Sequence, residues 1–197
     1  MNKLAWLLLA GLALSACKAD KTPNCNELAG AAPVDPVLLA FLSSARAAHH
    51  LADEREDAKD LKGALGPLQK LVSGPVPKTK GPELAPEVRE VLSDTRARMA
   101  DLESQLGEFE RALEDVARGL DLAREPTYFR GHLFETRGLV HERHAKALKA
   151  TDPAAAADAE KLAVSALEEA MAIQGGVIQN GAPAQPPDAS AAPKSAQ

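Results

Sequence analysis

Histidine and cysteine are the side chains best suited to metal or nucleophilic chemistry, and this 197-residue chain has only five histidines and two cysteines. His141 and His144 are three residues apart, so on a helix they share one face, as paired metal ligands do. No cysteine or carboxylate cluster completes a metal site beside them, and Arg143 adds positive charge there. The sequence also lacks a Gly-rich phosphate loop and a nucleophile elbow. We therefore predict no cofactor, no metal site and no enzymatic activity.

Cys17 stands at the end of an N-terminal signal. Lys3 precedes an apolar run over residues 4–13, and Leu-Ser-Ala then leads to the cysteine. A positive start, a short apolar segment and small residues before a cleavage site are typical of a secretory signal peptide. Residues 14–17 (LSAC) resemble the lipobox of bacterial lipoproteins, L-[AS]-[GA]-C. The resemblance implies that residues 1–16 are removed, that Cys17 is lipidated, and that the protein is anchored in the bacterial cell envelope.

The predicted anchor attaches the chain to a membrane without crossing it. The apolar run is about ten residues long, whereas a spanning helix needs about twenty. A triacylated cysteine exceeds the roughly two lipid signals that stable attachment needs. Enteric lipoproteins with Asp after the cysteine tend to stay at the inner membrane, and Lys18 stands there in this chain. The resemblance thus favours the outer membrane, facing the periplasm. The alternative is an ordinary cleaved signal with Cys17 unmodified.

Two segments, one before and one after the central region of the chain, are predicted to lack regular structure. Residues 17–34 contain Pro, Gly and Asn without periodic apolar positions, which indicates a flexible tether. Residues 175–197 are rich in Ala, Pro, Gly and Ser, which indicates a disordered tail. With Cys17 acylated, Cys25 is either a free thiol or pairs with another protein. The net charge of −5 gives no reason to expect a nucleic-acid partner.

Residues 35–174 predict an all-α domain of about six helices. Ala, Leu, Glu and Arg dominate this region, whereas the aromatic and β-branched residues typical of strands are scarce. Apolar residues recur every three or four positions, as on one face of a helix. Asp35-Pro36 and Asp152-Pro153 are each a capping residue followed by a first-turn proline. Pro67 predicts a kink or a helix start.

Residues 107–113 (GEFERAL) resemble the turn and second-helix start of a tetratricopeptide repeat (TPR), G-[DE]-[YF]-x-x-A-[LI]. Gly107 permits a tight turn, and the small Ala112 lets two helices approach closely. Weaker matches place the equivalent small residue at Ala64 and Ala163, at steps of 48 and 51, whereas the family period is 34. The resemblance implies degenerate antiparallel helical hairpins, stacked as a short TPR-like solenoid.

An alternative is that residues 86–124 form one long helix. The three-four spacing of apolar residues from Val88 to Leu120 continues through Gly107 without losing phase, as it would in a coiled coil. A glycine inside a helix costs only about 1 kcal/mol. We expect the hairpin, because the GEFERAL run is specific and because Thr95 is a poor residue for a coiled-coil seam.

Repeat solenoids bind partners on a concave surface, lined mainly by the first helix of each hairpin. This surface is acidic here, so the carboxylate-clamp recognition known in the family is not implied. We expect an adaptor for protein–protein interaction or an envelope assembly factor, with an envelope protein of unknown identity as its partner. The alternatives are a structural helical-bundle or coiled-coil lipoprotein without a peptide-binding groove and, less favoured, an envelope enzyme or metal binder. By analogy with the family, the partner-binding residues are Asp94, Ala97, Asp101, Ser104, His132, Glu135, Leu139 and Glu142.

Overall fold

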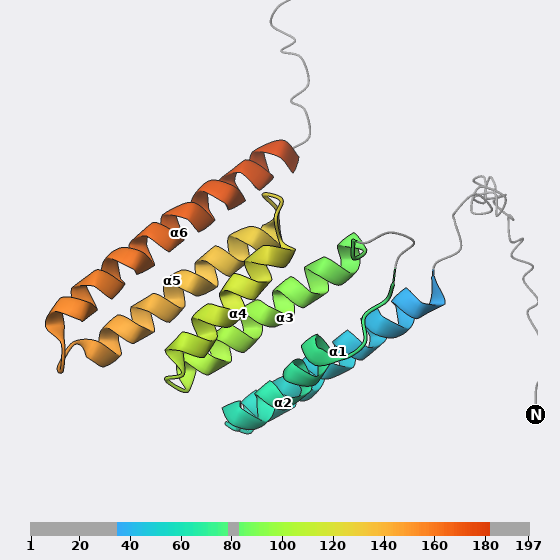
Figure 1. Ribbon diagram of the computed structural model, residues 1–197, viewed down its shortest axis with the longest axis horizontal. Helices are drawn as coiled ribbons and strands as arrows, with labels where there is room; N and C mark the ends of the chain where they lie inside the picture. The colour runs from blue at the N-terminus through green and yellow to red at the C-terminus, as the bar shows by residue number, and fades with distance from the viewer. Residues whose placement is uncertain (1–34, 79–82, 182–197) are drawn as a thin grey trace, which may run out of the picture. The chain divides into compact units, whose positions relative to one another are not determined.

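The computed structural model describes residues 35–78 and 83–181, which form an all-α domain (Figure 1). Its helices confirm the predicted fold class of about six helices, and the described residues contain no strand. None of these helices is long and apolar enough to cross a membrane. The helices are α1 (Pro36–Asp57), α2 (Leu61–Ser73), α3 (Pro86–Gln105), α4 (Phe109–Leu122), α5 (Tyr128–Leu148) and α6 (Pro153–Gly181).

Several predictions fall outside the described residues. They are the signal peptide over residues 1–16, the tether over residues 17–34 with Cys17 and Cys25, and residues 182–197 of the tail. The start of the predicted tail is corrected, because α6 continues from residue 174 to Gly181. Two glycines at 175 and 176 do not end the helix, since each costs a helix only about 1 kcal/mol.

The helices pair into three hairpins along the chain, α1 with α2, α3 with α4 and α5 with α6. The first helix of a later hairpin also packs on both helices of the hairpin before it (Figure 1). Thus α3 contacts α1 and α2, and α5 contacts α3 and α4, whereas α2, α4 and α6 do not contact one another. The odd-numbered helices therefore form a continuous layer through the domain.

Side-chain caps begin three of the helices. Asp35 Oδ1 accepts a hydrogen bond from the Val37 amide at 2.8 Å, and Asp152 Oδ1 accepts one from the Ala155 amide at 3.0 Å. Both caps were predicted. Asp60 Oδ1 accepts from the Gly63 amide at 2.9 Å, so α2 begins at Leu61 and continues through Pro67. A helix start at Pro67 is therefore wrong, because the cap at Asp60 sets the start of the helix upstream of the proline.

The turn between α3 and α4 confirms the hairpin and excludes one long helix over residues 86–124. Gly107 has φ 80°, in the left-handed region that favours glycine. The Gly107 amide donates to Ser104 O at 3.1 Å, and the Glu108 amide donates to Glu103 O at 2.9 Å. These two bonds form a Schellman motif, which ends a helix and satisfies its last carbonyls. As predicted, Ala112 is fully buried, in a cluster with Ala100, Val116 and Val140.

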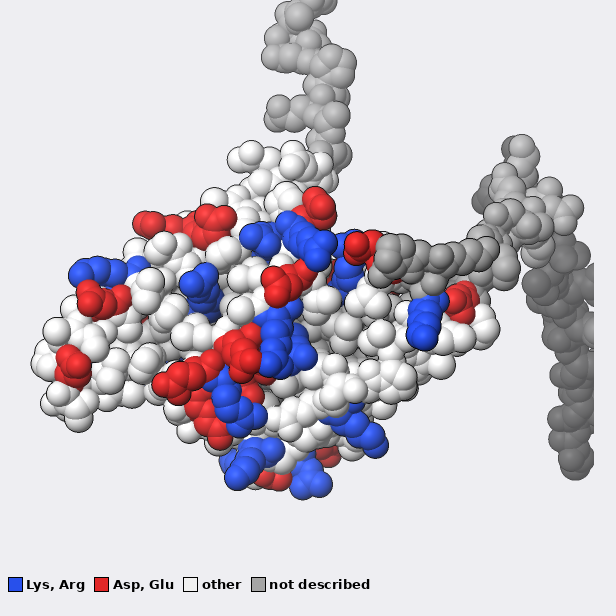
Figure 2. Space-filling view, in the orientation of Figure 1, with Lys and Arg blue, Asp and Glu red and all other residues white. Residues whose placement is uncertain are grey.

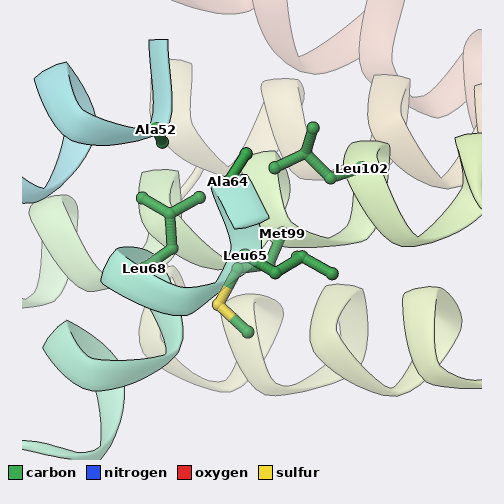
Figure 3. Close-up of a cluster of buried hydrophobic side chains, with 6 residues drawn as sticks. All are labelled: Ala52, Ala64, Leu65, Leu68, Met99 and Leu102. Atoms are coloured by element: carbon green, nitrogen blue, oxygen red, sulfur yellow. The ribbon is translucent and has the colours of Figure 1, made fainter. Parts of the chain in front are cut away.

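Different residues pack between the hairpins and within the last hairpin. Between the first hairpin and α3, a compact apolar cluster fills the space (Figure 3); its members are Ala52, Ala64, Leu65, Leu68, Met99 and Leu102. Between α5 and α6, small residues allow a close approach of the two backbones. A Cβ atom on Gly138 would lie 2.6 Å from Leu167 Cγ, so no larger residue fits there without movement.

Because Gly107 has a left-handed conformation, replacing it with alanine should change the free energy of unfolding in the opposite direction to the same replacement at a helical glycine. Gly107→Ala should lower the free energy of unfolding by about 1 kcal/mol or more, because alanine is strained at positive φ. Gly176→Ala, a matched control inside α6 with open space around the new Cβ, should raise it by up to about 1 kcal/mol. Urea denaturation followed by circular dichroism measures both. A Gly107→Ala protein as stable as the wild type would contradict the turn described above.

Candidate functional site

A cleft of about 410 Å³ lies between α1 and α3 and is bounded by Phe129 of α5. Its apolar lining comes from α1, α3 and α5. The cleft therefore exists because these three helices lie side by side in one layer. Its charged lining comes mainly from α3. The apolar residues are Leu42, Ala45, Val91 and Phe129, and the polar residues are Arg46, His49, Glu87, Glu90 and Asp94.

The carboxylates of Glu87, Glu90 and Asp94 dominate the charge of this cleft. Their spacing of three and four residues places them on one face of α3. Within the described part of the chain, none of them forms an ion pair or a side-chain hydrogen bond, and only Arg46 contributes an opposite charge to the lining. Unpaired carboxylates next to apolar surface suit a ligand that is both cationic and apolar.

In other parts of the domain, many charges of opposite sign are paired. On the face drawn in Figure 2, acidic and basic side chains lie beside one another rather than in separate regions. Ion pairs such as Lys146 with Glu142, at 2.5 Å, illustrate this arrangement. The row of unpaired carboxylates on α3 differs from this general pattern, which is why we take the cleft as the candidate site.

His49 connects the cleft to the junction between α1 and α3. The Thr95 hydroxyl donates to Val91 O at 2.7 Å, so it must accept from His49 Nε2–H, which is 3.0 Å away. His49 Nδ1 is then an acceptor, 3.4 Å from Arg98 Nη1. Burial lowers the pKa of His49, and the Arg98 charge also lowers it against the opposing effect of nearby acids. His49 is therefore neutral here and holds the two helices in register.

Arg98 completes that junction from α3. Its guanidinium donates to Glu56 Oε1 and Asp53 Oδ1, each at 2.5 Å, and to the carbonyl of His49 at 3.2 Å. Charge-assisted bonds of this kind are stronger than neutral ones. Sequence reasoning missed Arg98 and His49. A signal was present, because Thr95 interrupts the apolar spacing of α3 and shares a helix face with Arg98.

Of the predicted partner-binding residues, only Asp94 lines the cleft. Ala97 is 1% exposed and Ser104 is 3% exposed, so the prediction that they contact a partner is wrong. The reason is that α3 packs against α1, α2, α4 and α5, which leaves it less free surface than a first helix was expected to have. Arg143 of α5 also covers Ser104, with Nη1 2.6 Å from the hydroxyl.

The remaining predicted residues lie outside the cleft, and most have partners within the domain. Asp101 pairs with Arg143 at 2.7 Å, and Glu142 pairs with Lys146. His132 Nδ1 lies 3.5 Å from Glu135, and its ring stacks on Tyr128. Leu139 is half-buried on the same helix. These residues do not come together as one site.

Glu103 and Asp115 form a buried pair of carboxylates between α3 and α4. Glu103 is 1% exposed; Asp115 is also buried and accepts from Arg96 at 2.5 Å. Burial, and next the charge of Asp115, raises the pKa of Glu103 to about 7 against the opposing charge of Arg111. Two carboxylates close together are also found in the sites of acid–base catalysts. Both side chains are out of reach of a substrate, however, so this pair is a structural feature of the hairpin.

The two histidines noted in the sequence, His141 and His144, lie in different surroundings. His141 is buried, and the His144 ring stacks on Phe109 with 4.6 Å between centroids. Over residues 35–78 and 83–181, no three His, Cys, Asp or Glu side chains are grouped so as to hold a metal ion.

Comparison of the chain with protein-family models, curated proteins and solved structures finds no match.

The buried carboxylate pair predicts a pH-dependent stability. Folding raises the pKa of Glu103 from 4.5 to about 7, so the folded state binds this proton more tightly than the unfolded state. The contribution of Glu103 to the free energy of unfolding therefore falls as the pH rises through that interval, by roughly 1–3 kcal/mol. Glu103→Gln keeps the side-chain volume and removes the titration, so it should exceed the wild type in stability at pH 8.

Urea denaturation at pH 5 and pH 8 measures this difference. Glu110→Gln, on the exposed surface of α4, is the control for the loss of one charge and should follow the wild-type profile. An identical change in stability between the two pH values for the wild type and Glu103→Gln would rule out the raised pKa.

Proposed function

We propose that this protein is a lipid-anchored adaptor of the bacterial envelope that binds a basic, partly apolar segment of another envelope protein. The cleft between α1, α3 and α5 is the binding site. The observation that carries the proposal is the row of unpaired carboxylates at Glu87, Glu90 and Asp94 beside the apolar residues of the same cleft. Like charges in a row repel one another, and a cationic partner would relieve that repulsion.

The order of the hairpins supports an adaptor over a coiled-coil structural protein. A continuous layer of first helices is the arrangement that the TPR resemblance implies, and in that family the layer forms the binding surface. The resemblance does not extend to a carboxylate clamp, because the charged lining of the cleft is mainly acidic, whereas such clamps use Lys, Arg and Asn. The proposed partner is accordingly basic. We propose neither an enzymatic activity nor a cofactor, and nucleic acid is not a proposed partner.

The proposed location rests on the N-terminal sequence. Residues 14–17 resemble a lipobox, and Lys18 favours the outer membrane over the inner one. On this proposal, lipidated Cys17 holds the helical domain at the membrane surface, where it faces the periplasm. The domain would then meet its partner among periplasmic or membrane-attached proteins.

Charge reversal in the cleft tests the proposed site. Glu90→Lys combined with Asp94→Lys should reduce recovery of the partner by at least about tenfold, because attraction between charges across an interface becomes repulsion. Glu110→Lys combined with Glu114→Lys is the matched control, since it makes the same charge change at the same spacing on α4. Affinity purification from detergent-solubilised envelopes with quantitative mass spectrometry measures the recovery. A partner retained equally by the cleft variant would refute this site.

Replacement of Cys17 tests the anchor separately. Cys17→Ser should abolish incorporation of a fatty-acid analogue and release the protein from the membrane fraction, because the acyl chains supply the attachment. Cys25→Ser is the control and should label and fractionate like the wild type. Labelling that persists in Cys17→Ser would disprove lipidation at this residue while leaving the cleft untouched.

A further inference from the structure

The first hairpin has a second, larger groove on the side that α3 does not cover. It has a volume of about 740 Å³ and is lined by α1, by α2 and by residues 74–77, without any residue from α3 to α6. On α2 the lining residues Gly66 and Lys70 lie on the face opposite Leu65 and Leu68, which are buried against α3. The groove is thus the outer face of the hairpin at the beginning of the stack.

This outer face is unusually apolar for the end of a stack of hairpins. Terminal repeats normally carry a polar outer face, which keeps the protein soluble. Here Val37 and Leu51 line the groove and are each more than half exposed. Lys70 is the only charged residue of the lining, and within the described residues it has no ion pair or side-chain hydrogen bond. An apolar groove with one unpaired cation suits an apolar helix that carries one acid.

The last helix presents such a face at the other end of the stack. Val164, Met171 and Ile178 are each more than half exposed, and their spacing of seven places them on one side of α6. The buried alanines of α6 that contact the rest of the domain, such as Ala163 and Ala170, lie on another side. Glu168 lies on the exposed stripe with no ion pair or side-chain hydrogen bond in the described part of the chain.

The groove and the stripe match in length and in charge. The lining residues Val37, Ser44 and Leu51 repeat every seven residues along α1, as the exposed residues of α6 do. Each run extends for about 21 Å at the rise of an α-helix. The groove offers one unpaired cation, Lys70, and the stripe offers one unpaired anion, Glu168.

We propose that copies of this chain associate head to tail, with α6 of one copy in the α1–α2 groove of the next and Lys70 paired with Glu168. Because the two surfaces differ, an assembly has a free groove at one end and a free α6 at the other, so further copies can add to it unless it closes into a ring. The proposal goes beyond the adaptor function and does not depend on the cleft, which belongs to a different surface of α1.

Sedimentation of the full-length protein in detergent over a range of concentrations tests the association. The average mass should rise with concentration for the wild type. Lys70→Glu alone and Glu168→Lys alone should each weaken the association by at least about tenfold, because each places like charges opposite one another. An equimolar mixture of the two variants should recover the association, since every groove then finds a helix of opposite charge. The control variants Lys62→Glu and Glu169→Lys should behave as the wild type.

Cysteine cross-linking in the native membrane provides the second measurement. In a Cys25→Ala background, Ser44→Cys and Met171→Cys together should form a ladder of cross-linked species, whereas either substitution alone should not. A protein that stays monomeric at all concentrations without cross-links would overturn the proposal. Equal weakening by the control variants, or a mixture that does not recover, would overturn the pairing of Lys70 with Glu168.

Discussion

Helix α3 packs against four other helices, and the rest of the domain depends on that packing. A single helical hairpin cannot bury its own apolar face, so each hairpin in such a stack needs a neighbour. Here α3 supplies the contact on both sides, to α1 and α2 through one apolar cluster and to α4 and α5 through another. The Schellman turn at Gly107 makes this possible, because it returns the chain along α3 as α4 instead of extending it away from the domain.

The same packing explains the polar groups inside the domain. A helix surrounded on most sides has few positions that face water, so several polar residues of α3 are enclosed and must find partners. Thr95 and Arg98 bond to α1, and Arg96 bonds to Asp115 of α4. Two atoms of α3 are exceptions, because Arg89 Nε and one carboxylate oxygen of Glu103 are buried without a hydrogen-bond partner. An unpartnered buried oxygen disfavours the charged form, which agrees with the raised pKa of Glu103.

Local signals in the sequence predicted the local features of this fold. Asp35 and Asp152 cap helices because their side chains reach amides two or three residues away, and Gly107 turns the chain because of its own backbone freedom. Whether Ala97 and Ser104 are exposed depends instead on how many helices surround α3, which no short pattern encodes. The cleft was missed for the same reason, since Arg46, Glu90 and Phe129 become neighbours only when three helices pack together. Helix α6 continues beyond its predicted end at residue 174 for another reason: glycine destabilises a helix but does not by itself end it.

A stack of helical hairpins leaves apolar surface uncovered at its two ends. Every interior hairpin is covered by the next one, but the first groove and the last helix have no neighbour in the same chain. If the chain is anchored by Cys17 as proposed, its copies are held in one membrane plane, which raises their effective concentration relative to free diffusion. Two matched surfaces of about 21 Å would then need only modest affinity to meet. The lipid anchor and the uncovered ends would thus act together. A short apolar contact with one ion pair binds weakly, and the higher effective concentration in the membrane would compensate for that low affinity.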